Sequence, residues 1–134
     1  MNERMFKFLL ADDDREDQEI LIEAILQEQP TTQINTVFNG QKVLDYLAEQ
    51  APVEWPSLII LDYKMPVMNG REVLEKILQV NIPKVVWSTS SQPEHMQLCR
   101  ELGAVKYFVK PNNRPELQAM VQELFRICEG GVAR

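Results

Sequence analysis

The chain has 134 residues, of which 45% are hydrophobic, and a formal net charge of −6 at pH 7. This length and composition fit one globular domain with a single core. The acidic balance argues against a nucleic-acid-binding surface, which needs clustered Lys and Arg. No apolar stretch approaches the roughly 20 residues of a membrane span, and no signal peptide is evident, so we expect a cytoplasmic protein.

Two cysteines, Cys99 and Cys128, are the only ones in the sequence. They lie far apart, and each falls on the apolar side of a helical pattern. A disulfide or a metal site would need closer spacing or more ligands, so we expect two buried, reduced thiols.

Short apolar segments alternate with helical patterns along the whole chain. Acidic residues follow the first segment at once, as is typical of the first turn of a helix, where the helix dipole favours negative charge. The later helices are delimited by Pro and Gly residues, with Gly103 as the expected C-cap of the fourth. The expected strands are 5–11, 34–38, 57–61, 84–87 and 105–109, and the expected helices begin near residues 12, 43, 70, 93 and 115, the third continuing until Ile82 and Pro83.

This alternation predicts the fold class. Five strands alternating with five helices indicate an α/β protein with a parallel sheet, right-handed crossovers and helices on both faces. The flavodoxin-like, doubly wound order 2-1-3-4-5 matches the strand count and places the topological switch point between strands one and three. We expect one domain over residues 1–134, with its core at about 5–128 and no output domain.

Chemically active side chains follow four of the five strands. Asp12, Asp13 and Asp14 come after the first strand, and Asp62 ends the third. Neighbouring strand ends therefore bring several carboxylates into one crevice, where they suit Mg²⁺. The fourth strand adds a hydroxyl, from Ser88 or Thr89, and the fifth adds the ammonium of Lys110. Acids, metal, hydroxyl and ammonium together indicate a site that handles a phosphoryl group.

These segments resemble the response-regulator receiver domain of two-component signalling, and the size is similar to the stand-alone chemotaxis type. Any one segment would be a weak signal, but all occur in order, each at its own strand end. The segments that carry the resemblance are LLADDD at 9–14, LDYKMPVMNG at 61–70, WSTS at 87–90 and GAVKYFVKP at 103–111.

The resemblance implies a phosphoacceptor and a metal site. Asp62 matches the phosphoacceptor, which takes a phosphoryl group from a histidine kinase, a phosphotransfer protein or a small phosphodonor. Asp12 and Asp13 match the acidic pair that holds Mg²⁺, with Asp62 and the backbone carbonyl of Lys64 completing the protein ligands. The Lys64 side chain, two residues beyond the acceptor, is expected to alter the lifetime of the phosphoryl group.

The resemblance also implies phosphoryl-binding and switch residues. Ser88 matches the hydroxyl that bonds a phosphoryl oxygen in the active state, with Thr89 as the alternative register, and Lys110 matches the ammonium that pairs with the phosphoryl group. Tyr107 matches an aromatic switch that turns inward. The bond between Lys110 and Pro111 is cis in this family, an isomer found in only about 5–6% of X–Pro bonds generally.

The function implied is a phosphorylation switch and not a turnover enzyme. Its expected partners are a kinase or phosphotransfer protein and a downstream protein, with a phosphorylation-dependent homodimer left open. By resemblance, the downstream partner binds the fourth helix, fifth strand and fifth helix, including Arg100, Lys106 and Tyr107.

Two alternatives of other classes remain. Asp12 and Asp14 have the Asp-x-Asp spacing of haloacid-dehalogenase-type aspartyl-phosphate hydrolases, although Arg15 and Glu16 do not fit the continuation of that motif. A phosphorylation-independent binding module would normally lack one of the acids or the lysine, and none is missing.

Two aromatic residues also have interpretations that involve no function. Tyr107 could be only a surface aromatic, and His95, the sole histidine, is expected to be a solvent-exposed spectator.

Overall fold

A computed structural model describes residues 5–130 as a five-stranded sheet with helices on both faces. The strand order is β2-β1-β3-β4-β5, and every pair is parallel. This topology confirms the predicted fold class. The strands are β1 (Lys7–Ala11), β2 (Gln33–Val37), β3 (Leu58–Leu61), β4 (Lys84–Ser88) and β5 (Lys106–Val109).

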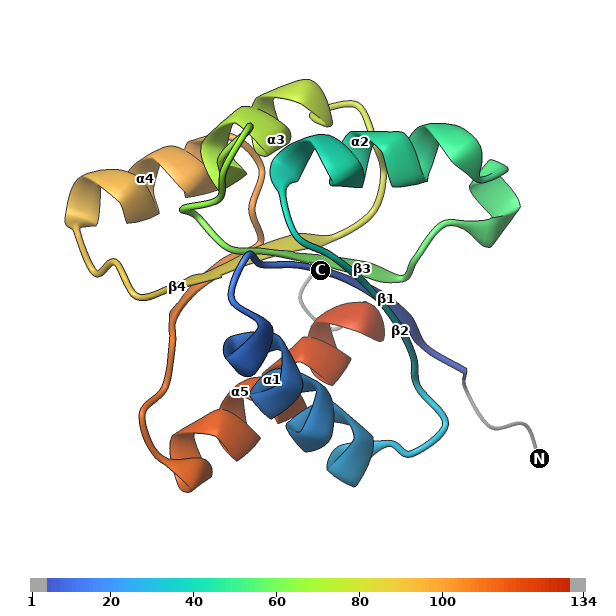
Figure 1. The fold of residues 1–134 in the computed structure, drawn as a ribbon. Helices are drawn as coiled ribbons and strands as arrows, with labels where there is room; N and C mark the ends of the chain where they lie inside the picture. The colour runs from blue at the N-terminus through green and yellow to red at the C-terminus, as the bar shows by residue number, and fades with distance from the viewer. Residues whose placement is uncertain (1–4, 131–134) are drawn as a thin grey trace.

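The helices form two layers around the sheet (Figure 1). Helices α1 and α5 cover one face, and α2, α3 and α4 cover the other. None of the helices between residues 5 and 130 combines the length and apolar character that a membrane span needs. The helices are α1 (Arg15–Glu28), α2 (Gly40–Glu49), α3 (Gly70–Lys76), α4 (Pro93–Glu101) and α5 (Arg114–Cys128), with a short 3₁₀ helix η1 (Pro52–Glu54) before β3.

The central strand β3 shows why this sequence forms a sheet covered on both sides. All four of its residues are fully buried. Leu58 and Ile60 face the core beneath α1 and α5, whereas Ile59 and Leu61 face the core beneath α2, α3 and α4. Side chains alternate between the two faces of a strand, so a continuous apolar run is what a strand with two covered faces requires.

Three details of the helices differ from the predictions. Helix α3 ends at Lys76, earlier than predicted, and Leu78 beyond it is 50% exposed. Helix α5 buries Phe125 and Ile127, which the pattern did not single out. Cys99 is buried as expected, but Cys128 is only half-buried, and no disulfide joins them. Burial raises the pKa of the Cys99 thiol to about 11, so it stays protonated at neutral pH.

The loop between β3 and α3 contains a strained residue. Val67 has φ of 69°, and the amide of Met68 donates a hydrogen bond to the carbonyl of Pro66 across it at 2.7 Å. A β-branched residue is rarely found at positive φ, because its side chain crowds the backbone. The loop is also tight at its end, since a Cβ on Gly70 would lie 2.6 Å from the backbone oxygen of Asp62. The chain leaving β3 is therefore held close to the residues it has just passed.

We expect Val67→Asn to stabilise the protein by about 1 kcal/mol, because Asn tolerates positive φ and Val67 is 78% exposed, so that little packing is lost. The measurement is urea unfolding followed by circular dichroism. The matched control is Val53→Asn, since Val53 is 86% exposed but does not have positive φ. Equal effects of the two substitutions would contradict an explanation based on backbone strain.

Candidate functional site

Two buried acids lie side by side at the carboxyl edge of the sheet, where β1 has β2 on one side and β3 on the other. The amide of Asp12 donates to the carbonyl of Val37 at the end of β2, and the amide of Asp62 donates to the carbonyl of Ala11 at the end of β1. Asp12 is fully buried and Asp62 is 6% exposed. The parallel register therefore holds both carboxyl groups at the topological switch point, the usual ligand-binding position of such sheets.

A third acid completes a cluster that fits a divalent cation. Asp12, the exposed Asp13 and Asp62 each offer a carboxylate oxygen, and these oxygens lie within 4.8 Å of one another. Carboxylate oxygens suit Mg²⁺ or Mn²⁺, and the exposed Asp13 leaves one side of the cluster open to the water that these ions keep. The structure thus brings together the three side chains that the sequence predicted as metal ligands. The exposed Lys64 follows two residues after Asp62, and its carbonyl stays a prediction.

The ammonium of Lys110 lies among the acids. Its Nζ is 2.8 Å from Oδ2 of Asp12, 2.7 Å from Oδ2 of Asp17 and 3.6 Å from Oδ2 of Asp62. Burial acts to lower the pKa of Lys110, but the hydrogen bonds to Asp12 and Asp17 and the negative charges around it outweigh burial and raise the pKa. Lys110 therefore stays cationic and offsets part of the charge of the cluster.

The backbone around Lys110 differs from one expectation. Its amide donates to the carbonyl of Ser88 at 2.7 Å, which ties the end of β5 to the end of β4. The prediction of a cis peptide bond between Lys110 and Pro111 is wrong, because residues 5–130 contain no cis peptide bond. The Lys110 side chain nevertheless enters the cluster, where its Nζ lies 4.8 Å from the centre of the Trp87 ring.

The carboxyl group of Asp62 is electrostatically perturbed. Burial and then the negative charge of Asp12 raise its pKa from 3.8 to about 7, and the charge of Lys110 opposes them only in part. A carboxyl with such a pKa keeps most of its proton below pH 7 and is mostly ionised above it, unless a bound cation lowers the pKa. Two carboxylates about 4 Å apart repel by roughly 4 kcal/mol at an effective dielectric near 20. The cluster therefore favours binding of a cation or a proton.

The two candidate hydroxyls differ in burial. Ser88 is 1% exposed at the end of β4, and its Oγ accepts a hydrogen bond from the amide of Ser90 at 3.1 Å. Thr89 is exposed. Ser88 also follows Trp87, whose ring lies beneath Lys110. Burial at the carboxyl edge thus favours Ser88 over Thr89 as the hydroxyl of the site.

Tyr107 and His95 both contact the loop after β4. Tyr107 is 7% exposed, and its hydroxyl donates to the carbonyl of Ser90 at 2.9 Å, so the interpretation as a surface aromatic is wrong. The Oγ of Ser90 lies 2.7 Å from Nδ1 of His95. The His95 ring stacks on Tyr63, with centroids 4.2 Å apart and planes at 19°. His95 is therefore half-buried and not the exposed spectator that the sequence predicted.

Sequence reasoning missed Asp17, Tyr63 and His95. Asp17 belongs to the acidic run after the first strand, which predicts a helix start and no role in the site, yet it makes the shortest ion pair of Lys110. Tyr63 directly follows Asp62 in the chain, so its position offered a signal, whereas the contact of His95 with it depends on the packing of α4. Asp14 instead caps α1 by accepting a hydrogen bond from the amide of Asp17.

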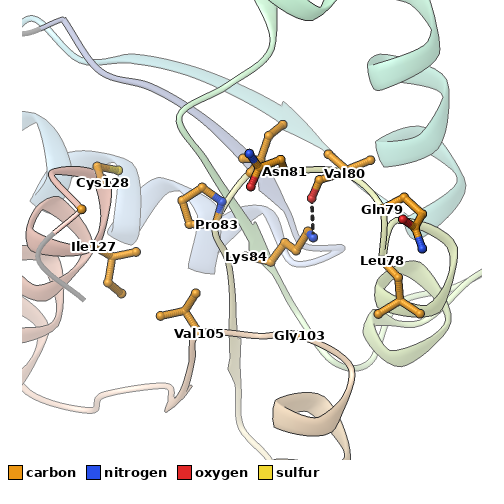
Figure 2. A pocket seen from close by; sticks show the side chains of 12 residues that line it. Leu78, Gln79, Val80, Asn81, Pro83, Lys84, Gly103, Val105, Ile127 and Cys128 are labelled. Atoms are coloured by element: carbon orange, nitrogen blue, oxygen red, sulfur yellow. Dashed lines mark hydrogen bonds between the residues drawn. The ribbon is translucent and has the colours of Figure 1, made fainter. Parts of the chain in front are cut away.

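A cavity of about 590 Å³ lies away from the acids (Figure 2). It is lined by residues at the amino ends of β4 and β5, including Lys84 and Val105, and by Ile127 of α5. The Nζ of Lys84 donates to the carbonyl of Val80 at 2.7 Å. The acids stand at the opposite, carboxyl ends of the strands, so this cavity is not part of the candidate site.

Fold and site together define a receiver domain, and comparison with known proteins agrees. The model of the response regulator receiver domain family matches residues 8–122. The chain therefore belongs to this family, whose members are signalling domains that interact with histidine kinases or phosphotransfer proteins and with downstream partners.

Curated relatives of the chain are longer proteins. The chain is 31% identical over 145 residues to the two-component response regulator ARR9 of Arabidopsis thaliana, an alignment covering 92% of the chain and 61% of that protein. It is 39% identical over 97 residues to a protein-glutamate methylesterase/protein-glutamine glutaminase of Clostridium acetobutylicum, covering 69% of the chain and 27% of that protein. The match thus spans less than two thirds of either relative.

Two solved structures resemble the whole fold. The phosphorylated cyanobacterial phytochrome response regulator RcpA has a TM-score of 0.83 at 27% identity, with 96% of each chain covered. The Mn²⁺-bound form of the response regulator Rcp1 has a TM-score of 0.77 at 29% identity, with 90% of this chain and 92% of that chain covered. The acidic cluster of this chain is consistent with a divalent metal site of that kind.

The raised pKa of Asp62 predicts how stability depends on pH in the absence of metal. Between about pH 4 and pH 7 the folded protein keeps a proton that the unfolded chain releases, so its stability falls as pH rises through this window. Asp62→Asn removes the effect. The measurement is the free energy of unfolding in urea, with EDTA present. We expect the difference between the variant and wild type in this free energy to be about 1–3 kcal/mol larger, in favour of the variant, at pH 8 than at pH 5.

The control for this prediction is Asp45→Asn, because Asp45 lies on α2, away from the acidic cluster. Its carboxylate accepts a hydrogen bond from Gln41 at 3.1 Å, and among residues 5–130 its one ion pair is with Lys42, at 3.9 Å. Its effect should be the same at both pH values. A gain for Asp62→Asn that does not change with pH would show that the buried carboxyl does not retain a proton.

Proposed function

We propose that this chain is a phosphoryl-accepting signalling switch and that Asp62 is the phosphoacceptor. The observation that carries the proposal is the convergence of Asp12, Asp62 and Lys110 from three strand ends on one point. A nucleophilic carboxylate, a site for a divalent cation and a fixed ammonium are what acceptance of a phosphoryl group requires. Family membership supports the same function.

In the proposed reaction, one carboxylate oxygen of Asp62 forms a bond to the phosphorus of the donor. The bond between phosphorus and the leaving group of the donor breaks, and its electron pair stays with the leaving group, a histidine imidazole or acetate. The product is an acyl phosphate on Asp62. Lys110 is placed to pair with the oxygens of the phosphoryl group, and Ser88, or Thr89 as the alternative, would donate a hydrogen bond to one of them.

The metal ligands in this proposal are Asp12, Asp13 and Asp62 with the backbone carbonyl of Lys64. Their oxygen chemistry and their spacing within 4.8 Å support the three carboxylates. Mg²⁺, when bound, supplies positive charge that stabilises the oxygens of the transferring group. Asp13 stands at the exposed side of the cluster, where a donor would approach.

Output would pass through the residues that follow β4 and through β5. The amide of Ser90 donates a hydrogen bond to the Oγ of Ser88, and the hydroxyl of Tyr107 donates one to the carbonyl of Ser90. A phosphoryl group on Asp62 that drew Ser88 toward it would therefore also displace Ser90 and Tyr107. The proposed partner surface consists of α4, β5 and α5, with the exposed Arg100 and Lys106; Tyr107 is too buried to contribute much to it. A phosphorylation-dependent homodimer through this surface is part of the proposal.

The proposal treats this chain as a receiver that accepts a phosphoryl group and is not a turnover enzyme. The hydrolase alternative needs Asp14 beside Asp12 in the site, whereas the Asp14 carboxylate caps α1. The phosphorylation-independent binding module stays as the second candidate.

The test is intact mass spectrometry after incubation with acetyl phosphate, with and without Mg²⁺. We expect one phosphoryl adduct on wild type that requires Mg²⁺ and that Asp62→Asn abolishes, because the amide is not a nucleophile. Asp45→Asn, outside the cluster, should form the adduct as wild type does. A folded wild-type protein that forms no adduct would favour the phosphorylation-independent module.

A further inference from the structure

Asp17 contacts the site from outside the carboxylate cluster. It is the third residue of α1, and its side chain is 30% exposed. Its Oδ2 lies 2.7 Å from Nζ of Lys110, the shortest of the three ion pairs that this ammonium makes. An acid in this helical position could simply interact with the helix dipole. Here its carboxylate reaches the lysine that the proposed function assigns to the phosphoryl group.

The contacts of Lys110 are uneven. Both of its hydrogen bonds go to Asp12 and Asp17, whereas Asp62 is 3.6 Å away, beyond hydrogen-bond distance. Its side chain is only 10% exposed, so these carboxylates meet an ammonium that water reaches poorly. The two hydrogen bonds thus hold the ammonium toward β1 and α1 and short of Asp62.

Asp12 and Asp17 differ in one respect. Asp12 belongs to the carboxylate cluster that fits a divalent cation, and Asp17 does not. Once Asp12 ligates a cation, its attraction for Lys110 weakens, because two positive groups then share one carboxylate. Asp17 keeps its full attraction. It is therefore the acid that holds Lys110 when the cluster is loaded.

We infer that Asp17 is a positioning residue that competes with the phosphoryl group for Lys110. This inference rests on the proposed function. A phosphoryl group on Asp62 must draw the ammonium away from Asp17 or share it, so the carboxylate of Asp17 weakens the interaction between Lys110 and the phosphoryl group. The residue thereby sets how strongly the phosphorylated state is favoured over the unmodified one.

The chain offers a matched control for Asp17. Glu16 is its neighbour, lies in the same first turn of α1 and is exposed. Lys110 has no ion pair with Glu16 among residues 5–130. Glu16→Gln therefore removes the same charge from the same end of the helix without touching Lys110. Asp17→Glu is the conservative variant, because it keeps a carboxylate near the ammonium.

The experiment measures the affinity for beryllofluoride, a phosphoryl analogue, at saturating Mg²⁺. The reporter is the fluorescence of Trp87, whose ring lies 4.8 Å from Lys110 Nζ, in a Trp55→Phe background. We expect Asp17→Asn to bind beryllofluoride about 3- to 10-fold more tightly than Glu16→Gln, as expected for removal of a competing ion pair of modest strength. Asp17→Glu should stay close to wild type. Equal or weaker binding by Asp17→Asn would overturn the inference.

A second readout separates this inference from the proposed function. In metal-free protein, nuclear magnetic resonance of the lysine ammonium groups should show slow proton exchange at Lys110, which Asp17→Asn loses and Glu16→Gln keeps. The inference would also be overturned if Asp17→Asn kept the slow proton exchange at Lys110. If wild type binds no beryllofluoride and forms no acyl phosphate, the proposed function fails, and this resonance still decides whether Asp17 holds Lys110.

Discussion

The repulsion between buried carboxylates at the edge of the sheet is the constraint on which the rest of this structure depends. Asp12 and Asp62 cannot move apart, because their amides are bonded to the neighbouring strands β2 and β1. One ammonium, that of Lys110, lies among them and offsets only part of their charge, so that Asp62 keeps a raised pKa of about 7. The close placement of the Asp12 and Asp62 carboxylates thus destabilises the folded domain by itself, and a bound cation or proton relieves the repulsion.

The two cores supply the free energy that holds this edge together. Each fully buried aliphatic side chain of β3 contributes roughly 1.5–3 kcal/mol, so the strand as a whole outweighs a repulsion of about 4 kcal/mol between two acids. In the register of β3 with β1, Leu61 lies opposite Ala11, so that Asp62 follows beside Asp12. A slip by one residue would exchange the two faces and move Asp62 away from Asp12. The same apolar run therefore stabilises the fold and positions the acid.

The sequence revealed the parts of the site that strand ends dictate. Asp12, Asp62 and Lys110 each follow an apolar run directly, and parallel strands place such residues at one edge whatever the details of packing. Asp17 and His95 were not predicted to take part, because their contacts depend on how the turns of α1 and α4 face the sheet, which a one-dimensional pattern does not specify. The end of α3 was placed too late for a related reason: apolar residues continue at helical spacing beyond Lys76, but the helix does not.

Helices α1 and α4, which cover opposite faces of the sheet, are held in place to different degrees. This difference indicates which of the two would move when charge is added at Asp62. Helix α1 buries Gln18, Leu21 and Ile25, and the side chain of Asp14 caps it. Helix α4 buries only Cys99 and has no side-chain hydrogen bond at its N-cap. What joins its first turn to the site is the ring of His95, which stacks on Tyr63 and is bonded to Ser90. A charge at Asp62 therefore acts on the firmly held α1 through Lys110 and Asp17. It acts on the weakly held α4 through Tyr63 and His95. The weakly held element changes position at lower cost, so under the proposed function α4 would carry the change to a partner.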